Sequence, residues 1–205
     1  MSGMTVAVPD APEFSQPLPV EANEAVLAFM ARRRSASALT LRAPGPTEDE
    51  LQTLLRLAVR VPDHGKLSPW RFIVIEGEAK ARIGAQLTDL AQARPDATKA
   101  LAALGKYNAP PLAVCVVSHV KPGDIPEWEQ LMSAGAVCAS LLNAAAALGY
   151  GANWITDWYA FDDLALAAIG VGPDERVAGF LYIGTAAEAP LERVRPDVNA
   201  LVTRP

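Results

Sequence analysis

The stretch "PEWEQLMSAGAVCASLLNAAAALG", residues 126–149, is the longest helical segment that the sequence predicts. Pro126 suits the first turn of a helix, where its missing N–H is not needed, and Gly149 suits the position just after the last turn. Small side chains recur inside the segment, at Ala134, Gly135, Ala136, Ala139 and Ser140. Because small side chains let another backbone approach closely, we expect a central helix that is buried on most sides.

Further helices and strands are predicted on both sides of this helix. Thr47 and Glu50 form a capping box that starts one of them, and Pro62 stops it. The other predicted elements are, in order, a helix at about 21–33, a strand at 71–76, helical structure at about 78–104 interrupted at Pro95, a buried strand at 111–118, a loop or short extended piece at 150–156, a helix near 162–169 and a strand at 177–184.

The two ends of the chain are expected to be extended arms around a single domain. Residues 1–20 hold four prolines and show no helical periodicity, so we interpret them as a flexible or extended arm before one domain at 21–205. Pro190, Pro196 and Pro205 predict a second extended segment. Two such arms would suit a dimer in which each tail crosses to the other chain, and frayed termini are the alternative.

Composition favours a globular protein of the cytoplasm. Hydrophobic residues make up 51% and charged residues 20% of the chain, whereas a disordered chain would have fewer apolar positions. The net charge of −5 gives no basic face for nucleic acid. No apolar stretch reaches the roughly 18 residues of a membrane span, and no signal peptide is indicated. Cys115 and Cys138 lie in apolar runs, as small buried hydrophobic residues do.

Several common motifs do not occur. No Gly-x-Gly-x-x-Gly follows a predicted strand, so a Rossmann dinucleotide site is unsupported. The segment "GKLS" at 65–68 lacks the upstream glycine, and the Ser or Thr directly after the lysine, that a P-loop requires. His64 and His119 match no metal-ligand spacing, and no Gly-x-Ser-x-Gly elbow is present. The sequence therefore predicts neither a zinc site nor a serine hydrolase.

Three arginines and a serine end the first predicted helix. Arg32, Arg33 and Arg34, followed by Ser35, place cations where the helix dipole is negative, which is worth about 0.3–1 kcal/mol. A solvated helix end is therefore one interpretation. The other is a phosphate clamp, because guanidinium groups bind phosphate through paired hydrogen bonds and a serine hydroxyl adds a donor.

Two further segments carry candidate functional residues. "RVPDHG" at 60–65 places Arg60, Asp63 and His64 on one loop between buried elements, where function is often found. A hydrogen-bonded structural histidine and a turn-forming aspartate are the alternative. The segment Trp154–Thr156 offers a flat surface that suits a ring system, or else an edge segment with a core aromatic.

Taken in order and spacing, "RRRSASALT", "RVPDHGKLSPWRFIVIEG", "EWEQLMSAG", "GYGANWIT" and "VAGFLYIGT" resemble the nitroreductase superfamily, and most closely its short NAD(P)H nitroreductase branch. The resemblance covers roughly residues 24–200. It implies an FMN-dependent α+β fold in which a mixed central sheet is surrounded by helices, one of them long and central. It also implies a homodimer with exchanged tails and one FMN at each of two sites built from both chains.

The resemblance assigns roles to individual residues. Those that would contact the FMN phosphate and ribityl chain are Arg33, Arg34 and Ser35. The FMN contacts from the second loop, at 60–65, are Arg60 and His64. The residues beside the flavin are Trp154, Ile155 and Thr156. The segment from Ala144 to Gly149 corresponds to a region assigned to the nicotinamide nucleotide. At Ser68 many members have Asn or Gln, and at Ile155 a basic residue, so fewer donors would face the flavin or the nucleotide here.

The function implied is an NAD(P)H-dependent oxidoreductase that follows a ping-pong cycle. NAD(P)H would reduce FMN and leave, and a nitroaromatic, a quinone or a related small-molecule acceptor would then take its place. Arg60 or Lys66 could stabilise the reduced flavin. The alternatives are different flavin chemistry on the same fold, such as dehalogenation, ring reduction or flavin cleavage, and a flavin-binding protein without turnover.

Overall fold

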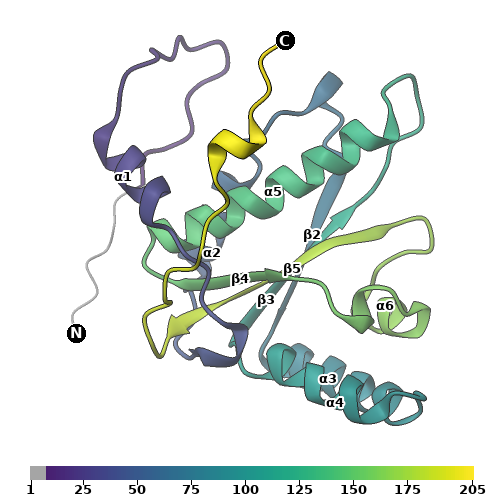
Figure 1. The fold of residues 1–205 in the computed structure, drawn as a ribbon. Helices are drawn as coiled ribbons and strands as arrows, with labels where there is room; N and C mark the ends of the chain where they lie inside the picture. The colour runs from purple at the N-terminus through teal and green to yellow at the C-terminus, as the bar shows by residue number, and fades with distance from the viewer. Residues whose placement is uncertain (1–7) are drawn as a thin grey trace.

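The computed structural model describes residues 8–205, so the first part of the expected N-terminal arm, 1–7, lies outside the described residues. An α+β fold is observed, in which helices cover both faces of a sheet (Figure 1). The helices are α1 (Glu24–Arg32), α2 (Glu48–Ala58), α3 (Gly77–Gln92), α4 (Ala97–Asn108), α5 (Glu127–Ala147) and α6 (Asp163–Ile169). The strands are β1 (Leu41–Arg42), β2 (Trp70–Glu76), β3 (Leu112–Ser118), β4 (Gly151–Ile155) and β5 (Arg176–Ala186).

The sheet is built around β5. One edge of β5 pairs with β3, which in turn pairs with β2, and the other edge pairs with β4. The last two residues of β5 pair with β1. Leu181 of β5 lies between Val114 of β3 and Trp154 of β4, which fixes the register across the sheet.

The α+β class is confirmed, but the expected mixture of strand directions is wrong, because every pairing within residues 8–205 is antiparallel. The reason is the place of β5. Strands β3 and β4 are joined through α5 and run in the same direction, as a crossover connection produces. β5 then inserts between them and runs in the opposite direction, so that no two parallel strands are neighbours.

Two hydrophobic clusters form the core, one on each face of the sheet. On one face α2 and α5 pack against the sheet, with Leu54, Leu141 and Leu181 fully buried. On the other face α3, α4 and α6 pack against it, around a group of aromatic rings. In that group the hydroxyls of Tyr159 and Tyr182 lie 2.8 Å apart and share a hydrogen bond. The rings on this face therefore enclose paired polar atoms.

The predicted long helix is confirmed as α5, whose 21 residues lie between Pro126 and Leu148. Gly149 follows with a positive φ of 87°, which suits a glycine at a helix end. By length and composition α5 would also suit a membrane span, but half of the relevant window is buried inside the fold. The expected burial on most sides is therefore wrong for a single chain: of the small residues on which it rested, only Ala134 is buried, and Gly135, Ala136, Ala139 and Ser140 are partly exposed.

The capping box of α2 is also confirmed. The Thr47 hydroxyl accepts a hydrogen bond from the Glu50 N–H, and the Glu50 carboxylate accepts one from the Thr47 N–H at 2.8 Å. Tyr150 donates its hydroxyl proton to the same carboxylate at 2.7 Å, which joins the start of α2 to the chain just before β4. Ser140 of α5 donates to the Leu57 carbonyl at 3.0 Å, which joins the two helices near the end of α2.

The ends of the described chain lie on the outside of the molecule. Residues 8–23 and 187–205 contain neither α-helix nor strand, and α1 has no buried residue. The body holds the two segments through a few hydrogen bonds, among them one from Arg56 to the Pro9 carbonyl at 2.8 Å. In Figure 1 the C-terminal segment, in yellow, passes in front of α5.

Candidate functional site

The arginine run lies where α1 meets the sheet. After Arg33, which caps α1, the chain runs beside β4: the Ala36 N–H donates to the Ala152 carbonyl at 3.0 Å, and the Asn153 side chain donates to the Ala36 carbonyl. These two hydrogen bonds hold the segment from Arg33 to Ser35 next to the strand that carries Trp154. The structure therefore brings two of the three predicted segments together.

Arg33 carries a buried polar atom without a partner. Its Nη1 is inaccessible to solvent and has no hydrogen-bond partner in the described structure. Burial lowers the pKa of the Arg33 guanidinium, and the positive charges of Arg195 and Arg34 lower it further. The guanidinium groups of Arg34 and Arg195 thus lie near that of Arg33, and both contact the Glu192 carboxylate, at 3.4 and 3.1 Å, whereas Arg33 Nη1 has no acceptor. An anion with several acceptor oxygens would supply what Arg33 lacks.

Arg34 is already in contact with the C-terminal segment. Its Nε donates to the Leu191 carbonyl at 2.9 Å and lies 3.4 Å from the Glu192 carboxylate. Beside it is a cavity of about 310 Å³, to which Ser35, Ser37 and Thr40 contribute and which residues 188–191 close. Hydroxyl donors and a guanidinium therefore line the same space. The contact also means that the C-terminal segment, and not only α1, shapes this site.

Trp154 packs against a glycine of the neighbouring strand. A Cβ built on Gly179 would lie 2.0 Å from the Trp154 indole nitrogen, so only glycine leaves room for the ring. The indole N–H donates to the Ala178 carbonyl at 3.2 Å, and the side chain remains 39% exposed. Alternation along β4 places Ile155 on the opposite face, where it packs against the core, and Thr156 is exposed. Trp154 thus provides a fixed, partly exposed aromatic surface.

The second loop is held by the first half of α5. His64 Nδ1 lies 2.7 Å from a carboxylate oxygen of Glu129, and Ser133 donates to the Pro62 carbonyl at 2.6 Å. The Asp63 carboxylate accepts the Ser68 N–H at 2.9 Å, which confirms its expected part in a turn. Gly65 has φ of 70°, and a Cβ there would meet Ile125 at 2.6 Å. Arg60 and His64 are exposed on this ordered loop.

Within one chain the loop and the arginine run lie apart. The loop contacts the start of α5, whereas the arginine run lies beside β4, which follows the end of α5. A helix of 21 residues is about 31 Å long. No hydrogen bond or ion pair within 8–205 joins Arg60 or His64 to the Arg33–Ser35 segment. One described chain therefore does not bring all three segments into one site.

The segment from Ala144 to Gly149 forms the end of α5 and the turn after it. Ala144 and Ala145 are buried in the core, and the Ala144 carbonyl accepts the Leu148 N–H at 3.0 Å. These contacts are those of a helix end that packs in the core. A role in binding the nicotinamide nucleotide stays a prediction.

Three residues of the site were not predicted from the sequence. Arg195 reaches Arg33 only through the path of the C-terminal segment, and nothing in its local sequence indicates this contact. Gly179 interrupts an apolar strand, which is a known sign of close approach by another group. Glu129 lies one helical turn before Ser133, so both side chains face the same loop.

Comparison with known proteins gives consistent matches. Residues 30–185 match the model of the Nitroreductase family. A curated protein of Escherichia coli K12, named "Putative NAD(P)H nitroreductase YdjA", is 37% identical over 161 residues, which are 78% of this chain and 87% of that protein.

Two solved structures are similar in fold. A nitroreductase-like family protein from Bacillus cereus has a TM-score of 0.78 at 20% identity and covers 91% of this chain and 98% of its own. A nitroreductase with bound FMN from Bacteroides fragilis has a TM-score of 0.67 at 21% identity, covering 89% and 99%.

Proposed function

Because the chain belongs to the nitroreductase family, we propose that it is an FMN-dependent oxidoreductase that uses NAD(P)H to reduce small-molecule acceptors. The acceptors would be nitroaromatics, quinones or related compounds. The enzyme would reduce them in the cytoplasm by a ping-pong cycle. The name of the Escherichia coli relative supports the reductant, and the FMN in the Bacteroides fragilis structure supports the cofactor. The single observation that carries the proposal is the buried, unpartnered Nη1 of Arg33 beside two further guanidinium groups.

The residues present fit FMN. Its phosphate would bind Arg33 and Arg34 together with the Ser35 hydroxyl, and Arg195 would add a third cation from the C-terminal segment. A phosphate monoester carries about −1.5 to −2 charges at neutral pH, which matches a cluster of cations. Trp154 would face the flavin end of the cofactor from β4, and Thr156, which is exposed, would lie beside it; Ile155 points to the other face of the sheet, so only its backbone would face the flavin.

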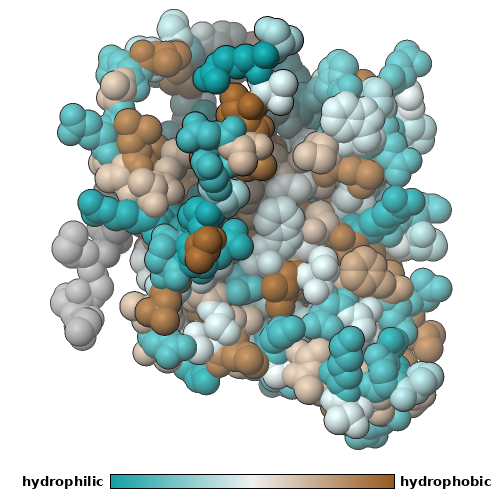
Figure 2. All heavy atoms as spheres, in the orientation of Figure 1, coloured by the Kyte–Doolittle hydropathy of each residue, from teal (hydrophilic) through white to brown (hydrophobic). Residues whose placement is uncertain are grey.

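A second copy of the chain would complete the site. The loop that carries Arg60 and His64 contacts the start of α5, too far from the arginine cluster of its own chain, so we infer that these residues approach the cluster of the partner subunit. The apolar side chains of α1 are uncovered in one chain, with Met30 67% and Leu27 64% exposed, and Figure 2 shows hydrophobic side chains on the surface over this helix. The C-terminal segment likewise exposes Val194 and Leu191. Burying these side chains would favour a homodimer with exchanged tails.

The chemistry divides between the cofactor and the chain. Bound FMN would supply hydride acceptance and donation. The chain would orient the cofactor by its phosphate and keep a flat space open above it for the two substrates in turn. Glu129 holds His64 by Nδ1, and Nε2, which has no hydrogen-bond partner among residues 8–205, would face the bound molecule. Arg60 or Lys66 would stabilise negative charge on the flavin ring.

Anaerobic reduction of the purified protein tests the proposal. We expect a yellow protein whose visible flavin absorbance bleaches with NADH or NADPH and returns when menadione or nitrofurazone is added. Varying both substrates should give parallel double-reciprocal lines, as a ping-pong cycle requires. Each substrate is also tested alone as a control.

The other outcomes separate the alternatives. A protein that stays colourless with added FMN would contradict every flavin-based function. Bound flavin that neither nucleotide bleaches would indicate a binding protein without turnover. Flavin that bleaches but is not reoxidised by nitroaromatics or quinones would indicate different flavin chemistry on this fold.

A further inference from the structure

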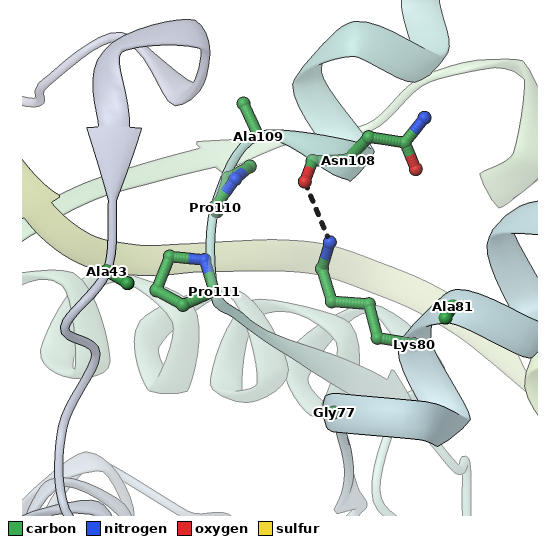
Figure 3. A pocket seen from close by; sticks show the side chains of 8 residues that line it. All are labelled: Ala43, Gly77, Lys80, Ala81, Asn108, Ala109, Pro110 and Pro111. Carbon is green, nitrogen blue, oxygen red and sulfur yellow. Dashed lines mark hydrogen bonds between the residues drawn. The ribbon is translucent and has the colours of Figure 1, made fainter.

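Lys80 lies in a cavity on the sheet face opposite Trp154. The cavity has a volume of about 400 Å³ and lies between the start of α3 and the end of α4 (Figure 3). Lys80 is the one charged side chain among the residues that line it, which are Ala43, Gly77, Lys80, Ala81, Asn108, Ala109, Pro110 and Pro111. In Figure 3 the Lys80 side chain extends from α3 across the space toward Asn108.

The Lys80 amine is buried without a carboxylate partner. The residue is only 8% exposed, and its Nζ has a single, long hydrogen bond of 3.3 Å, to the Asn108 carbonyl. The Nζ also lies 4.7 Å from the centre of the Tyr107 ring. Tyr107 is the other titratable group in contact with Lys80, and its hydroxyl donates to the Lys80 carbonyl at 3.2 Å. Among residues 8–205 no ion pair involves Lys80.

The ammonium form of Lys80 is therefore poorly compensated. Burial lowers the pKa of the Lys80 amine to about 8. At pH 7.5 about a quarter of such amines would be uncharged, compared with about one in a thousand for a lysine of ordinary pKa. An uncharged amine is a nucleophile, whereas an ammonium is not, and desolvated lysines in proteins form imines for this reason.

We propose that Lys80 is a covalent binding site for small uncharged aldehydes, which enter the cavity between α3 and α4. The amine nitrogen attacks the carbonyl carbon, and one amine proton moves to the carbonyl oxygen to give a carbinolamine. Loss of the hydroxyl group with the second amine proton releases water and leaves an imine between Lys80 and the aldehyde carbon. No oxidant or reductant is needed, so the step is independent of the flavin.

The cavity walls suit such a ligand. Three alanines and two prolines contribute apolar walls beside the Lys80 amine and the Asn108 carbonyl, which suits a small molecule that has an apolar chain and one polar carbonyl group. The simpler account is that Lys80 only caps the carbonyl end of α4, since cations are favoured there. That account requires a permanently charged ammonium, which would react slowly with aldehydes. The rate at which Lys80 reacts with an aldehyde therefore distinguishes a helix cap from a covalent binding site.

Reductive labelling of the intact protein tests the proposal. The protein is incubated at pH 7.5 with propanal and sodium cyanoborohydride, which traps the imine as a secondary amine, and propylation is followed by peptide mass spectrometry. Lys66 and Lys99 are exposed and serve as internal comparators. We expect Lys80 to label at least tenfold faster than either, with a rate that rises to half its maximum near pH 8. Labelling of Lys80 no faster than the comparators would overturn the proposal.

Two controls connect the reactivity to the folded cavity. In urea Lys80 should be labelled no faster than Lys66 and Lys99, because its environment is then the same as that of the other lysines. Ala81→Leu fills the cavity from an exposed position on α3, so the fold should tolerate it, and Lys80 labelling should fall while that of Lys99 is unchanged. An advantage that persists in urea, or with Ala81→Leu, would also overturn the proposal.

Discussion

Trp154 and Gly179 show how one missing side chain shapes the site. The indole occupies the space that a Cβ on Gly179 would require, at 2.0 Å from the ring nitrogen. Glycine inside a strand weakens the strand, so its presence here needs a reason, and the aromatic surface of β4 supplies one.

Gly179→Ala should displace Trp154. The added methyl group cannot coexist with the ring, so we expect a loss of stability of about 1–3 kcal/mol, typical of overpacking, together with a changed tryptophan fluorescence spectrum. Urea unfolding measures the loss of stability. The double variant Gly179→Ala with Trp154→Ala is the matched control, because the clash is then absent. An equal cost in both backgrounds would show that the indole is not the cause.

Glu175 ties three parts of the chain together. Its carboxylate accepts hydrogen bonds from Arg71 Nε at 2.7 Å and from the Gly172 N–H at 2.8 Å, and it lies 3.1 Å from His119 Nδ1. The hydrogen bonds from Arg71 contribute most to lowering the pKa of Glu175, to about 2. The network joins β2 to the turn before β5.

Stability should therefore depend on the ionisation of Glu175 at acid pH. A carboxyl whose pKa is lower in the folded state stabilises the fold above its unfolded pKa of about 4.3, and this contribution is lost as the pH falls toward 2. Since Arg71 is 42% exposed, we expect about 2 kcal/mol. Glu175→Gln should lose this amount at pH 6 and little at pH 2.5 in urea unfolding. Glu78→Gln, an exposed change, is the control; the same loss at both pH values would contradict the assignment.

At the scale of elements, local signals predicted the helices well. The Thr47 and Glu50 capping box, the Pro126 start of α5 and the interruption at Pro95 are each decided within a few residues. Five residues carry too little periodicity for the sequence to predict the strand after α5 as more than a loop or short extended piece. The antiparallel sheet was not predicted, since the insertion of β5 between β3 and β4 depends on contacts far apart in the sequence.

Thr47→Ala should destabilise the start of α2. The change removes the hydroxyl that accepts the Glu50 N–H, and loss of such a cap costs about 1 kcal/mol. Urea unfolding of the variant should show this loss, and Thr47→Ser, which keeps the hydroxyl, should restore most of it. Equal stability of the alanine and serine variants would mean that the cap does not contribute.

At the scale of the whole molecule, the proposed site is spread over segments that lie far apart in the sequence. The sequence predicted the arginine run and the Trp154 strip separately, and the structure places them side by side through the contact of Ala36 with Ala152. The part played by Arg195 could not be predicted, because it depends on the path of the C-terminal segment. The loop that carries Arg60 and His64 is expected to reach this site from a second chain.

The purified protein should be a dimer. Light scattering after gel filtration should give twice the chain mass of 21.7 kDa, and removal of residues 187–205 should weaken both the dimer and FMN binding, since the segment carries Arg195 and exposed apolar side chains. A full-length chain that stays monomeric while it binds FMN normally would contradict the proposed site built from two chains.

The most direct test of the central claim, that Arg33 binds the phosphate of FMN, compares FMN with riboflavin, which lacks the phosphate. Fluorescence titration gives the Kd of each flavin for the wild type, for Arg33→Ala and for the exposed control Arg32→Ala. We predict that Arg33→Ala weakens FMN binding by about 1.5–3 kcal/mol, roughly 10- to 150-fold, the scale of a hydrogen bond to a charged group. Riboflavin binding should not change, and Arg32→Ala should affect neither flavin. Unchanged FMN binding in Arg33→Ala, or an equal loss for both flavins, would contradict the claim.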